Sequence, residues 1–195
     1  MKSSMAHPQR DFLIGRRLLL AAAPAFFAAP ALARLGPELL KGGMAKFTLA
    51  PSPKPLPDLA FTDGEDRPVT LAGYKGKTVL LNFWATWCAP CVKEMPSLDR
   101  LQAEMGKEKF VVLPLSLDGP SRPKVAPFYA DNKLTNLGIY FDKGKKVLGA
   151  LDVSVLPTSI LIDSQVRELG RLEGEANWDK PEAIVLMKAA IESAG

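Results

Sequence analysis

The chain has 195 residues, of which 47% are hydrophobic, so it is long enough for one folded domain with a sizeable core. Its formal net charge of +4 does not indicate nucleic-acid binding, because the first 33 residues contribute +3 and the rest is nearly neutral. The single histidine, His7, also lies in that first segment. The remaining chain therefore excludes a Cys-His nucleophile and a Cys/His zinc site.

Residues 1–33 have the organisation of an export signal. Arg16-Arg17 precedes an apolar run from Leu18 to Ala29, and Ala31-Leu32-Ala33 has the small residues of a cleavage site. The run contains Pro24, is followed by Pro30, and is shorter than the roughly 20 residues of a membrane span. We expect export to the periplasm with cleavage after Ala33, and a retained inner-membrane anchor facing the periplasm is the alternative. The twin arginines leave a folded-protein export route open beside the general secretory one.

Residues 34–57 form a proline-rich segment. Alternating prolines, at Pro51, Pro53, Pro55 and Pro57, favour an extended polyproline II spacer and cannot pair as a central strand. We therefore expect a linker that precedes a single folded domain over residues 58–195. The spacer would hold the domain away from what precedes it, and an ordinary connection to the export signal is the alternative.

From residue 58 onward, strand patterns alternate with helix patterns. In chain order we expect a hairpin at Leu59–Leu71, a strand at Thr78–Trp84, a helix from Cys88 to about Met105, a strand at Lys109–Leu117, a helix from Ser121 to about Asn132, a short apolar segment at Ile139–Phe141, a strand pair at Thr158–Asp163 and Glu168–Leu172, and a closing helix at Asp179–Ser193. Two strands joined through a helix form a parallel βαβ unit. This order predicts an α/β domain in which helices flank a central mixed sheet.

Cys88 and Cys91 are the only cysteines of the chain, and they stand where a buried strand runs into a helix. Unpaired amides and the macrodipole at the helix start favour a thiolate at Cys88, which prepares it as the nucleophile. Cys91 would lie on the same side and deeper, where it can attack a mixed disulfide on Cys88 and release the partner. An inert disulfide or a two-thiolate metal site is the alternative.

The stretch Phe83–Cys91, together with Val155-Leu156-Pro157-Thr158, resembles the thioredoxin superfamily. Cys91-Val92-Lys93-Glu94-Met95-Pro96 is similar to the periplasmic or membrane-anchored TlpA and ResA-type branch, and the resemblance covers roughly residues 57–191. It implies a thioredoxin-like three-layer fold with an added N-terminal β-hairpin. Relatives tend to have glycine where this chain has Val166, and a β-branched residue tolerates positive φ poorly.

The resemblance also implies roles for residues around the cysteines. Pro157 would be a cis proline that faces the disulfide, and Leu156 would offer backbone groups to the extended chain of a partner. Trp87 is expected to form an apolar platform beside Cys88, with a purely structural tryptophan as the alternative. Thr158 completes the expected substrate-binding set.

Glu94 lies three residues beyond Cys91, on the same face of the expected helix. A carboxylate near a buried thiol can move its proton during exchange, whereas a solvated surface glutamate is the alternative. Cytosolic thioredoxins resemble the preceding strand but carry an aspartate where this chain has Asn82. The resemblance therefore favours Glu94 as the catalytic group that transfers the proton.

These features favour an exported thiol-disulfide oxidoreductase that works as a reductant, a monomer without metal or cofactor. It would act on protein disulfides and be re-reduced by a membrane thiol electron donor. By resemblance, the substrates are cysteine pairs of apocytochrome c, or of copper chaperones and the copper-binding subunit of cytochrome oxidase. A periplasmic disulfide oxidase or isomerase, and a non-enzymatic module that binds Cu(I) through both thiolates, are the alternatives.

Overall fold

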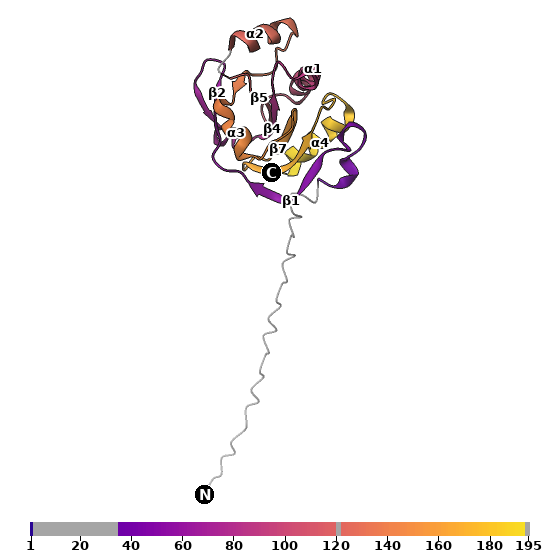
Figure 1. The fold of residues 1–195 in the computed structure, drawn as a ribbon. Coiled ribbons are helices and arrows are strands. Elements are labelled where there is room, and N and C mark those ends of the chain that lie inside the picture. Colours follow the sequence, from indigo (N-terminus) through magenta and orange to yellow (C-terminus); the bar gives the residue numbers. More distant parts are fainter. Residues whose placement is uncertain (2–34, 120–121, 194–195) are drawn as a thin grey trace.

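The computed structural model describes Met1, residues 35–119 and residues 122–193, so the expected export signal lies outside the described residues apart from Met1. Figure 1 shows a sheet through the centre of the folded part with helices packed around it. The elements are β1 (Thr48–Pro55), β2 (Ala60–Asp63), β3 (Pro68–Thr70), β4 (Thr78–Trp84), α1 (Ala89–Met105), β5 (Phe110–Ser116), α2 (Arg122–Asp131), β6 (Tyr140–Phe141), α3 (Lys146–Ala150), β7 (Thr158–Ile162), β8 (Arg167–Glu173) and α4 (Pro181–Ser193). In the described part of the chain, no helix is both long enough and apolar enough to cross a membrane.

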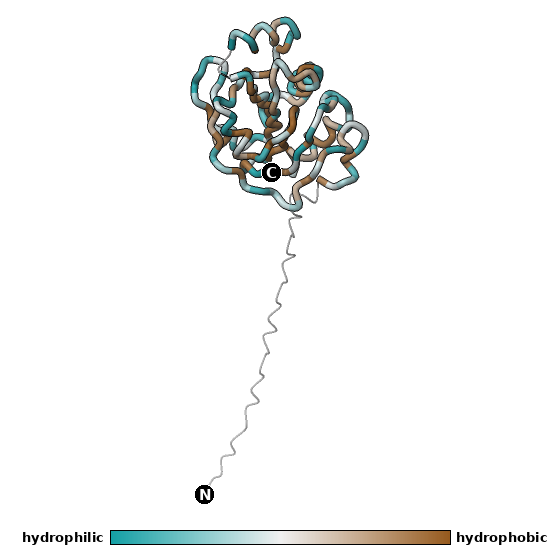
Figure 2. The backbone as a smooth tube through the Cα atoms, in the orientation of Figure 1, coloured by the Kyte–Doolittle hydropathy of each residue, from teal (hydrophilic) through white to brown (hydrophobic). Residues whose placement is uncertain are grey.

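The eight strands are ordered β1-β8-β7-β4-β5-β6-β2-β3. At the centre, β4 pairs in parallel with β5 and antiparallel with β7, and all seven of its residues are buried. A largely apolar strand that is buried along its whole length is typical of a strand covered on both faces. Figure 2 shows hydrophobic backbone segments concentrated in the interior. The predicted mixed sheet with flanking helices, including the hairpin formed by β2 and β3, is confirmed.

The helix α1 follows β4 after a short loop. Cys88 is its N-cap residue, and Pro90 occupies the first turn, where the missing N–H is not needed. The helix ends before Gly106, whose φ of 68° a glycine adopts without strain. Pro96 lies inside the helix, which still continues to Met105. The buried side of α1 therefore places the second cysteine and the residues after it against the sheet.

The proline-rich segment differs from the extended linker that we expected. Residues 48–55 form β1, which pairs antiparallel with β8 at the edge of the sheet, and Met44 and Phe47 are buried in the core. Prolines are compatible with this position because an edge strand pairs on one side only. Gly170 of β8 allows the close approach, since a Cβ there would lie 2.5 Å from the carbonyl oxygen of Thr48. Part of the segment 34–57 thus packs onto the domain that we expected over residues 58–195.

The turn between β7 and β8 does place Val166 at positive φ, at 62°. The Asp163 carboxylate accepts hydrogen bonds from the amides of Gln165 and Arg167, both at 2.9 Å, and pairs with the Arg167 guanidinium at 2.6 Å. The Val166 amide donates to the Asp163 carbonyl oxygen at 3.0 Å. These bonds offset the cost of the left-handed conformation at a β-branched residue.

The last helix, α4, lies beside α1. Lys188 of α4 is 3.9 Å from Glu104 of α1, and the Arg100 guanidinium of α1 donates at 2.8 Å to Asp179, just before α4. The loop between β8 and α4 therefore runs along α1, next to the turn that contains the cysteines and Glu94. The helix α3, which is only five residues long, was not predicted from the sequence.

Candidate active site

Cys88 and Cys91 form a disulfide at the N-terminus of α1, with their Cα atoms 5.3 Å apart. Cys88 is 7% exposed, whereas Cys91 is fully buried. The sulfur that a partner can reach therefore belongs to Cys88, and Cys91 lies behind it. Free amides at the helix start and the helix dipole favour the thiolate of Cys88 once the disulfide is reduced.

Asp118 holds the loop that leads into Cys88. Its carboxylate accepts hydrogen bonds from the Thr86 amide at 2.9 Å and the Thr86 hydroxyl at 2.6 Å. The Ser116 hydroxyl donates to the same carboxylate at 2.9 Å. Because β4 and β5 are adjacent parallel strands, the loops that follow them meet at one edge of the sheet. Asp118 was not among the predicted site residues, because nothing in the local sequence pattern links it to Thr86, 32 positions earlier.

Glu94 is only 2% exposed, which rules out the surface glutamate considered from the sequence. Its Oε1 accepts a hydrogen bond from the Asn82 side-chain amide at 2.7 Å. Its Oε2 accepts from the Ala176 amide at 3.0 Å and from the Trp178 indole at 3.3 Å. The Asn82 amide also donates to the Ser159 hydroxyl at 3.0 Å. One carboxylate thus joins α1 to β4 and to the loop between β8 and α4.

Burial raises the pKa of Glu94 to about 7. The hydrogen bonds from Ala176, Asn82 and Trp178 oppose this rise because they favour the charged form, while the nearby charge of Glu175 adds to it. A carboxyl that titrates near neutral pH can accept a proton in one step and release it in another. Glu94 therefore has the electrostatic property that a proton carrier near a thiol requires.

The loop before β7 contains the other predicted site residues. The Leu156–Pro157 peptide bond is cis, as the resemblance implied, and Pro157 is buried. The Thr158 side chain is also buried, and its hydroxyl donates to the Val155 carbonyl oxygen at 2.8 Å. Thr158 therefore supports the shape of this loop, and its side chain does not lie on the surface where a partner could contact it.

Trp87 and Leu156 are brought together at the surface beside Cys88. Trp87 is 66% exposed and Val155 is 43% exposed, so both present apolar surface to solvent. Trp87 and Leu156 line a cavity of about 360 Å³, which is completed by Leu117, Lys145, Leu148, Val153 and Ser154. Most of the lining is apolar, so the cavity is suited to an apolar side chain of a partner.

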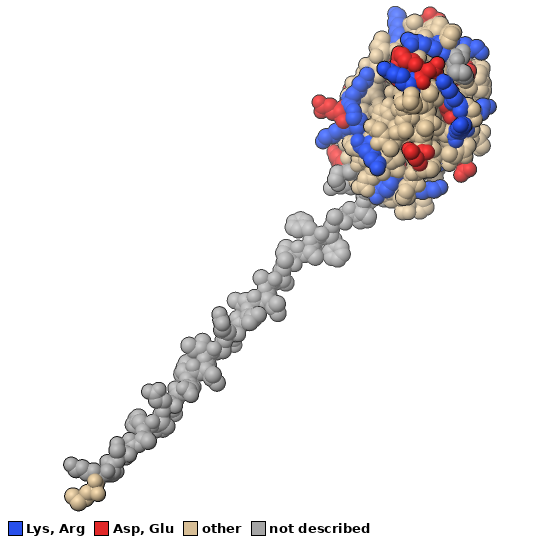
Figure 3. Space-filling view, turned by 90° about the vertical axis from the view of Figure 1, so that its left-hand side faces the viewer, with Lys and Arg blue, Asp and Glu red and all other residues tan. Residues whose placement is uncertain are grey.

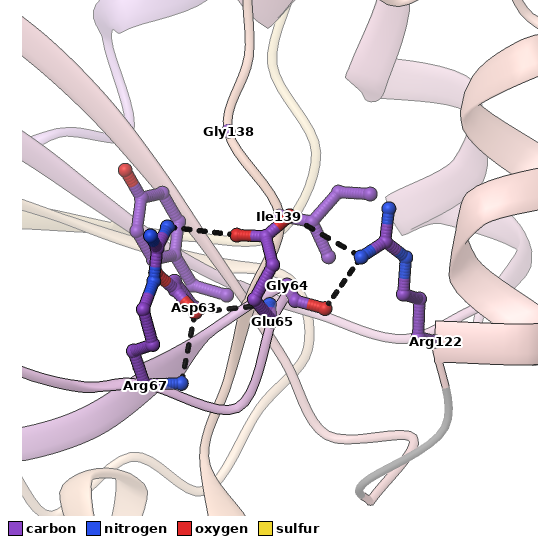
Figure 4. Close-up of a pocket in the computed structure, with 8 residues that line it drawn as sticks. Asp63, Gly64, Glu65, Arg67, Arg122, Gly138 and Ile139 are labelled. Atoms are coloured by element: carbon purple, nitrogen blue, oxygen red, sulfur yellow. Dashed lines mark hydrogen bonds and ion pairs between the residues drawn. The ribbon is translucent and has the colours of Figure 1, made fainter.

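A separate cavity of about 300 Å³ lies at the turn between β2 and β3. Figure 4 shows Arg67 and Arg122 approaching Glu65 from opposite sides, at 2.9 and 3.2 Å. Figure 3, which views the side of the molecule that carries β2 and α3, shows basic and acidic side chains around an uncharged area. Because the charged groups in this cavity already pair with one another, we assign no ligand to it.

Within the ranges that the structure describes, no cluster of three or more His, Cys, Asp or Glu residues could hold a metal ion.

The site combines three features on a thioredoxin-like sheet: a disulfide at the start of a helix, a loop with a cis proline, and a buried carboxylate. This combination defines a thiol-disulfide oxidoreductase whose redox-active pair is Cys88 and Cys91. Comparison with known proteins leads to the same class. Residues 53–168 match the AhpC/TSA family, and the chain belongs to this thioredoxin-like family.

Individual relatives are similar to this chain in sequence, in structure, or in both. The thiol-disulfide oxidoreductase ResA of Bacillus anthracis is 36% identical over 129 residues, which cover 66% of this chain and 73% of that protein. A DsbF homologue from Corynebacterium diphtheriae has a TM-score of 0.60 at 29% identity, covering 74% of this chain and 90% of that one. The pneumococcal exposed lipoprotein thioredoxin of Streptococcus pneumoniae has a TM-score of 0.56 at 26% identity, and the match covers 68% of this chain and 98% of that one.

Proposed function

We propose that this protein is an exported protein-disulfide reductase in which Cys88 attacks, Cys91 resolves and Glu94 carries the proton. The observation that supports this most directly is the buried Glu94 carboxyl, one helical turn beyond the buried Cys91, with a pKa of about 7. A thiol that is removed from water cannot pass its proton directly to solvent, so a nearby group must accept it. Glu94 fits this role.

The proposed reaction transfers two electrons from the cysteine pair to the substrate. The Cys88 thiolate attacks a substrate disulfide, which forms a mixed disulfide and frees one substrate thiolate. Glu94 takes the Cys91 proton, and the Cys91 sulfur attacks Cys88. The bond between Cys88 and the substrate breaks, the second substrate thiolate leaves and takes up a proton, and the Cys88–Cys91 disulfide forms. A membrane dithiol then reduces this disulfide again.

We propose that the partner binds over the apolar surface formed by Trp87, Val155 and Leu156. The exposed indole and the 360 Å³ cavity beside it would receive the segment that flanks the target cysteine. Trp87→Ala should therefore raise the KM for a protein disulfide and leave the reduction of a small disulfide unchanged. Since Trp87 is exposed, the substitution should change the free energy of unfolding of the protein by no more than about 0.5 kcal/mol. Equal effects on both substrates would contradict this binding surface.

Export is supported by the signal-like residues 1–33 and by the likeness to an exposed lipoprotein thioredoxin. We propose a periplasmic monomer, with membrane anchoring through an uncleaved signal as the alternative. The resemblance of the sequence to the TlpA and ResA-type branch implies substrates in respiratory assembly, and the 36% identity to a thiol-disulfide oxidoreductase ResA fits that branch. These are the cysteine pairs of apocytochrome c, or of copper-site proteins of cytochrome oxidase.

Trapping the mixed disulfide tests this proposal. In Cys91→Ser the resolving thiol is missing, so a substrate should remain bound to Cys88 through a disulfide that dithiothreitol releases. Cys88→Ser is the matched control, and it should form no mixed disulfide at residue 88 because it lacks the attacking thiol. Recovery of apocytochrome c or of a copper-site protein supports the assignment, and recovery of neither class removes both versions.

The direction of electron flow is tested separately. A measured potential near the roughly −120 mV of a strong disulfide oxidant would contradict a reductant and favour the oxidase. Insulin reduction, assayed with and without added copper, distinguishes catalysis from copper carriage. Catalysis that needs no copper supports the reductase, whereas stoichiometric Cu(I) binding without catalysis supports the copper-binding module.

A further inference from the structure

A small cavity of about 50 Å³ opens beside the Glu94 carboxylate. It is lined by Glu94 together with Lys93, Glu175, Ala176 and Asn177, and it shares no lining residue with the cavity next to Trp87. A site that holds one water molecule needs roughly 10–15 Å³ of such volume, so this cavity has room for water. Its walls offer the polar groups that an ordered water requires.

Glu94 has no other evident outlet for a proton among the described residues. Its hydrogen-bond partners are the Asn82 amide on β4, the Ala176 backbone amide and the Trp178 indole, and behind Asn82 lies the Ser159 hydroxyl on β7. None of these neutral groups takes up a proton near pH 7. The small cavity, which Glu94 lines, therefore offers its proton a path that these hydrogen-bond partners do not.

An ion pair stands at the outer side of this cavity. The Lys93 Nζ of α1 lies 2.5 Å from the Glu175 Oε1 in the loop between β8 and α4. Their side chains are 71% and 41% exposed, although both residues line the cavity. The charged residues that line the cavity with Glu94 are thus Lys93 from its own helix and Glu175 from the opposite loop, and the neutral Asn82 of β4 and Ser159 of β7 complete the hydrogen-bond network of Glu94.

We propose that this cavity is the route by which Glu94 exchanges its proton with solvent, and that Lys93 and Glu175 are positioning residues that control the charge at its mouth. The inference rests on the proposed role of Glu94. After Cys91 gives its proton to the Glu94 carboxylate and its sulfur bonds to Cys88, the protonated Glu94 passes the proton to water in the cavity. The carboxylate is thereby restored, and the proton reaches solvent beside Glu175. The same path works in reverse when the disulfide is reduced.

The test follows the two chemical steps separately in the reduced full chain. An aromatic disulfide whose released thiolate absorbs visible light serves as the probe. Attack by Cys88 releases one thiolate, and resolution by Cys91 releases the second, so stopped-flow absorbance gives two phases. The pH dependence of the second phase reports the ionisation of Glu94, because the ionised carboxylate is the form that accepts the Cys91 proton.

Neutralising Glu175 and neutralising Lys93 should shift this pH profile in opposite directions. Glu175→Gln removes a negative charge near Glu94, so the acidic limb should move to lower pH by roughly 0.5 unit, which is about a threefold faster second phase on that limb. Lys93→Gln leaves Glu175 without its partner, so the limb should move to higher pH by a similar amount. A merely structural role would move both variants the same way.

Asp179→Asn is the matched control, because it breaks the ion pair with Arg100 that also joins α1 to this loop but does not line the cavity. It should leave the profile unchanged. Shifts of the same sign in both test variants, or no shift in either, would overturn the proposal. If the wild type shows no second phase at all, the proposed function fails instead of this inference.

A third variant tests the route itself. Ala176→Val narrows the cavity while it keeps the backbone amide that bonds Glu94. The second phase should slow at every pH, whereas the first phase, which reports an intact fold and an intact Cys88, should not change. An unchanged second phase would overturn the route, and if both phases change, the two charge variants decide.

Discussion

Glu94→Gln removes a carboxyl whose burial sets a clear pH dependence of stability. In the folded chain the pKa of Glu94 is raised to about 7, against 4.5 for an ordinary glutamate. Between these two values the folded chain holds a proton that the unfolded chain has lost. The folded state is therefore favoured less and less as pH rises through this window, and the loss is complete above about pH 7. The separation of the two values corresponds to about 3 kcal/mol.

Urea unfolding of the disulfide form at several pH values between about 4 and 8 measures this contribution of Glu94 to the free energy of unfolding. The wild type should lose about 3 kcal/mol more than Glu94→Gln as the pH rises, because all other titrating groups are present in both proteins. At the acidic end of this range the NH2 group of glutamine cannot accept a hydrogen bond as a carboxyl oxygen can, so Glu94→Gln should start about 1–3 kcal/mol below the wild type. The two stability curves should consequently converge as pH increases.

Kinetics provide the second half of the same prediction. With the proton acceptor gone, resolution by Cys91 should slow by about 10²–10⁴-fold, whereas the initial attack by Cys88 should be little affected. A variant whose stability depends on pH as steeply as that of the wild type would refute the reasoning about burial. A variant that resolves at the wild-type rate would refute the proton-carrier role.

Three further substitutions test other parts of the structure. Asn82→Asp places a second carboxyl within hydrogen-bond distance of Glu94, where Asn82 now donates at 2.7 Å, so the pair should titrate at higher pH and the rate profile of resolution should move upward; a profile at the wild-type position would contradict this. Asp118→Ala leaves the Thr86 amide without its acceptor and should lower the free energy of unfolding by about 1–3 kcal/mol in urea; no loss would show that the loop is held by other contacts. Phe47→Ala should cost about 3–5 kcal/mol because this residue is buried in the core, whereas a negligible loss would restore the linker interpretation.

Local features of the sequence were sufficient for the central elements. The continuous apolar run at Thr78–Trp84 predicts a buried strand, and it is the central strand β4. Pro90 two residues after Cys88 predicts a helix start, and Cys88 is the N-cap of α1. Both predictions depend on neighbouring residues, whose conformational preferences act over one strand or one helical turn. They place both cysteines at the junction of a strand and a helix without any long-range contact.

The proline-rich segment shows where local preference fails. Alternating prolines favour an isolated extended spacer, but β1 gains pairing with β8 on its one available edge, next to Gly170. The burial of Met44 and Phe47 adds apolar contacts that the composition of residues 34–57 does not reveal. Contacts that pair residues more than 100 positions apart decide this segment, so its own sequence could not.

The sequence alone determined the two-thiol chemistry, because it contains one cysteine pair at a strand–helix junction and no histidine beyond His7. It also nominated Glu94, but only by its spacing from Cys91. The tertiary structure decided the electrostatics of that carboxyl, since Asn82, Ala176 and Trp178 reach it from a strand and from a loop more than 80 residues away. A pKa depends on desolvation and on the charges and donors around the group, and these exist only once distant segments have packed together.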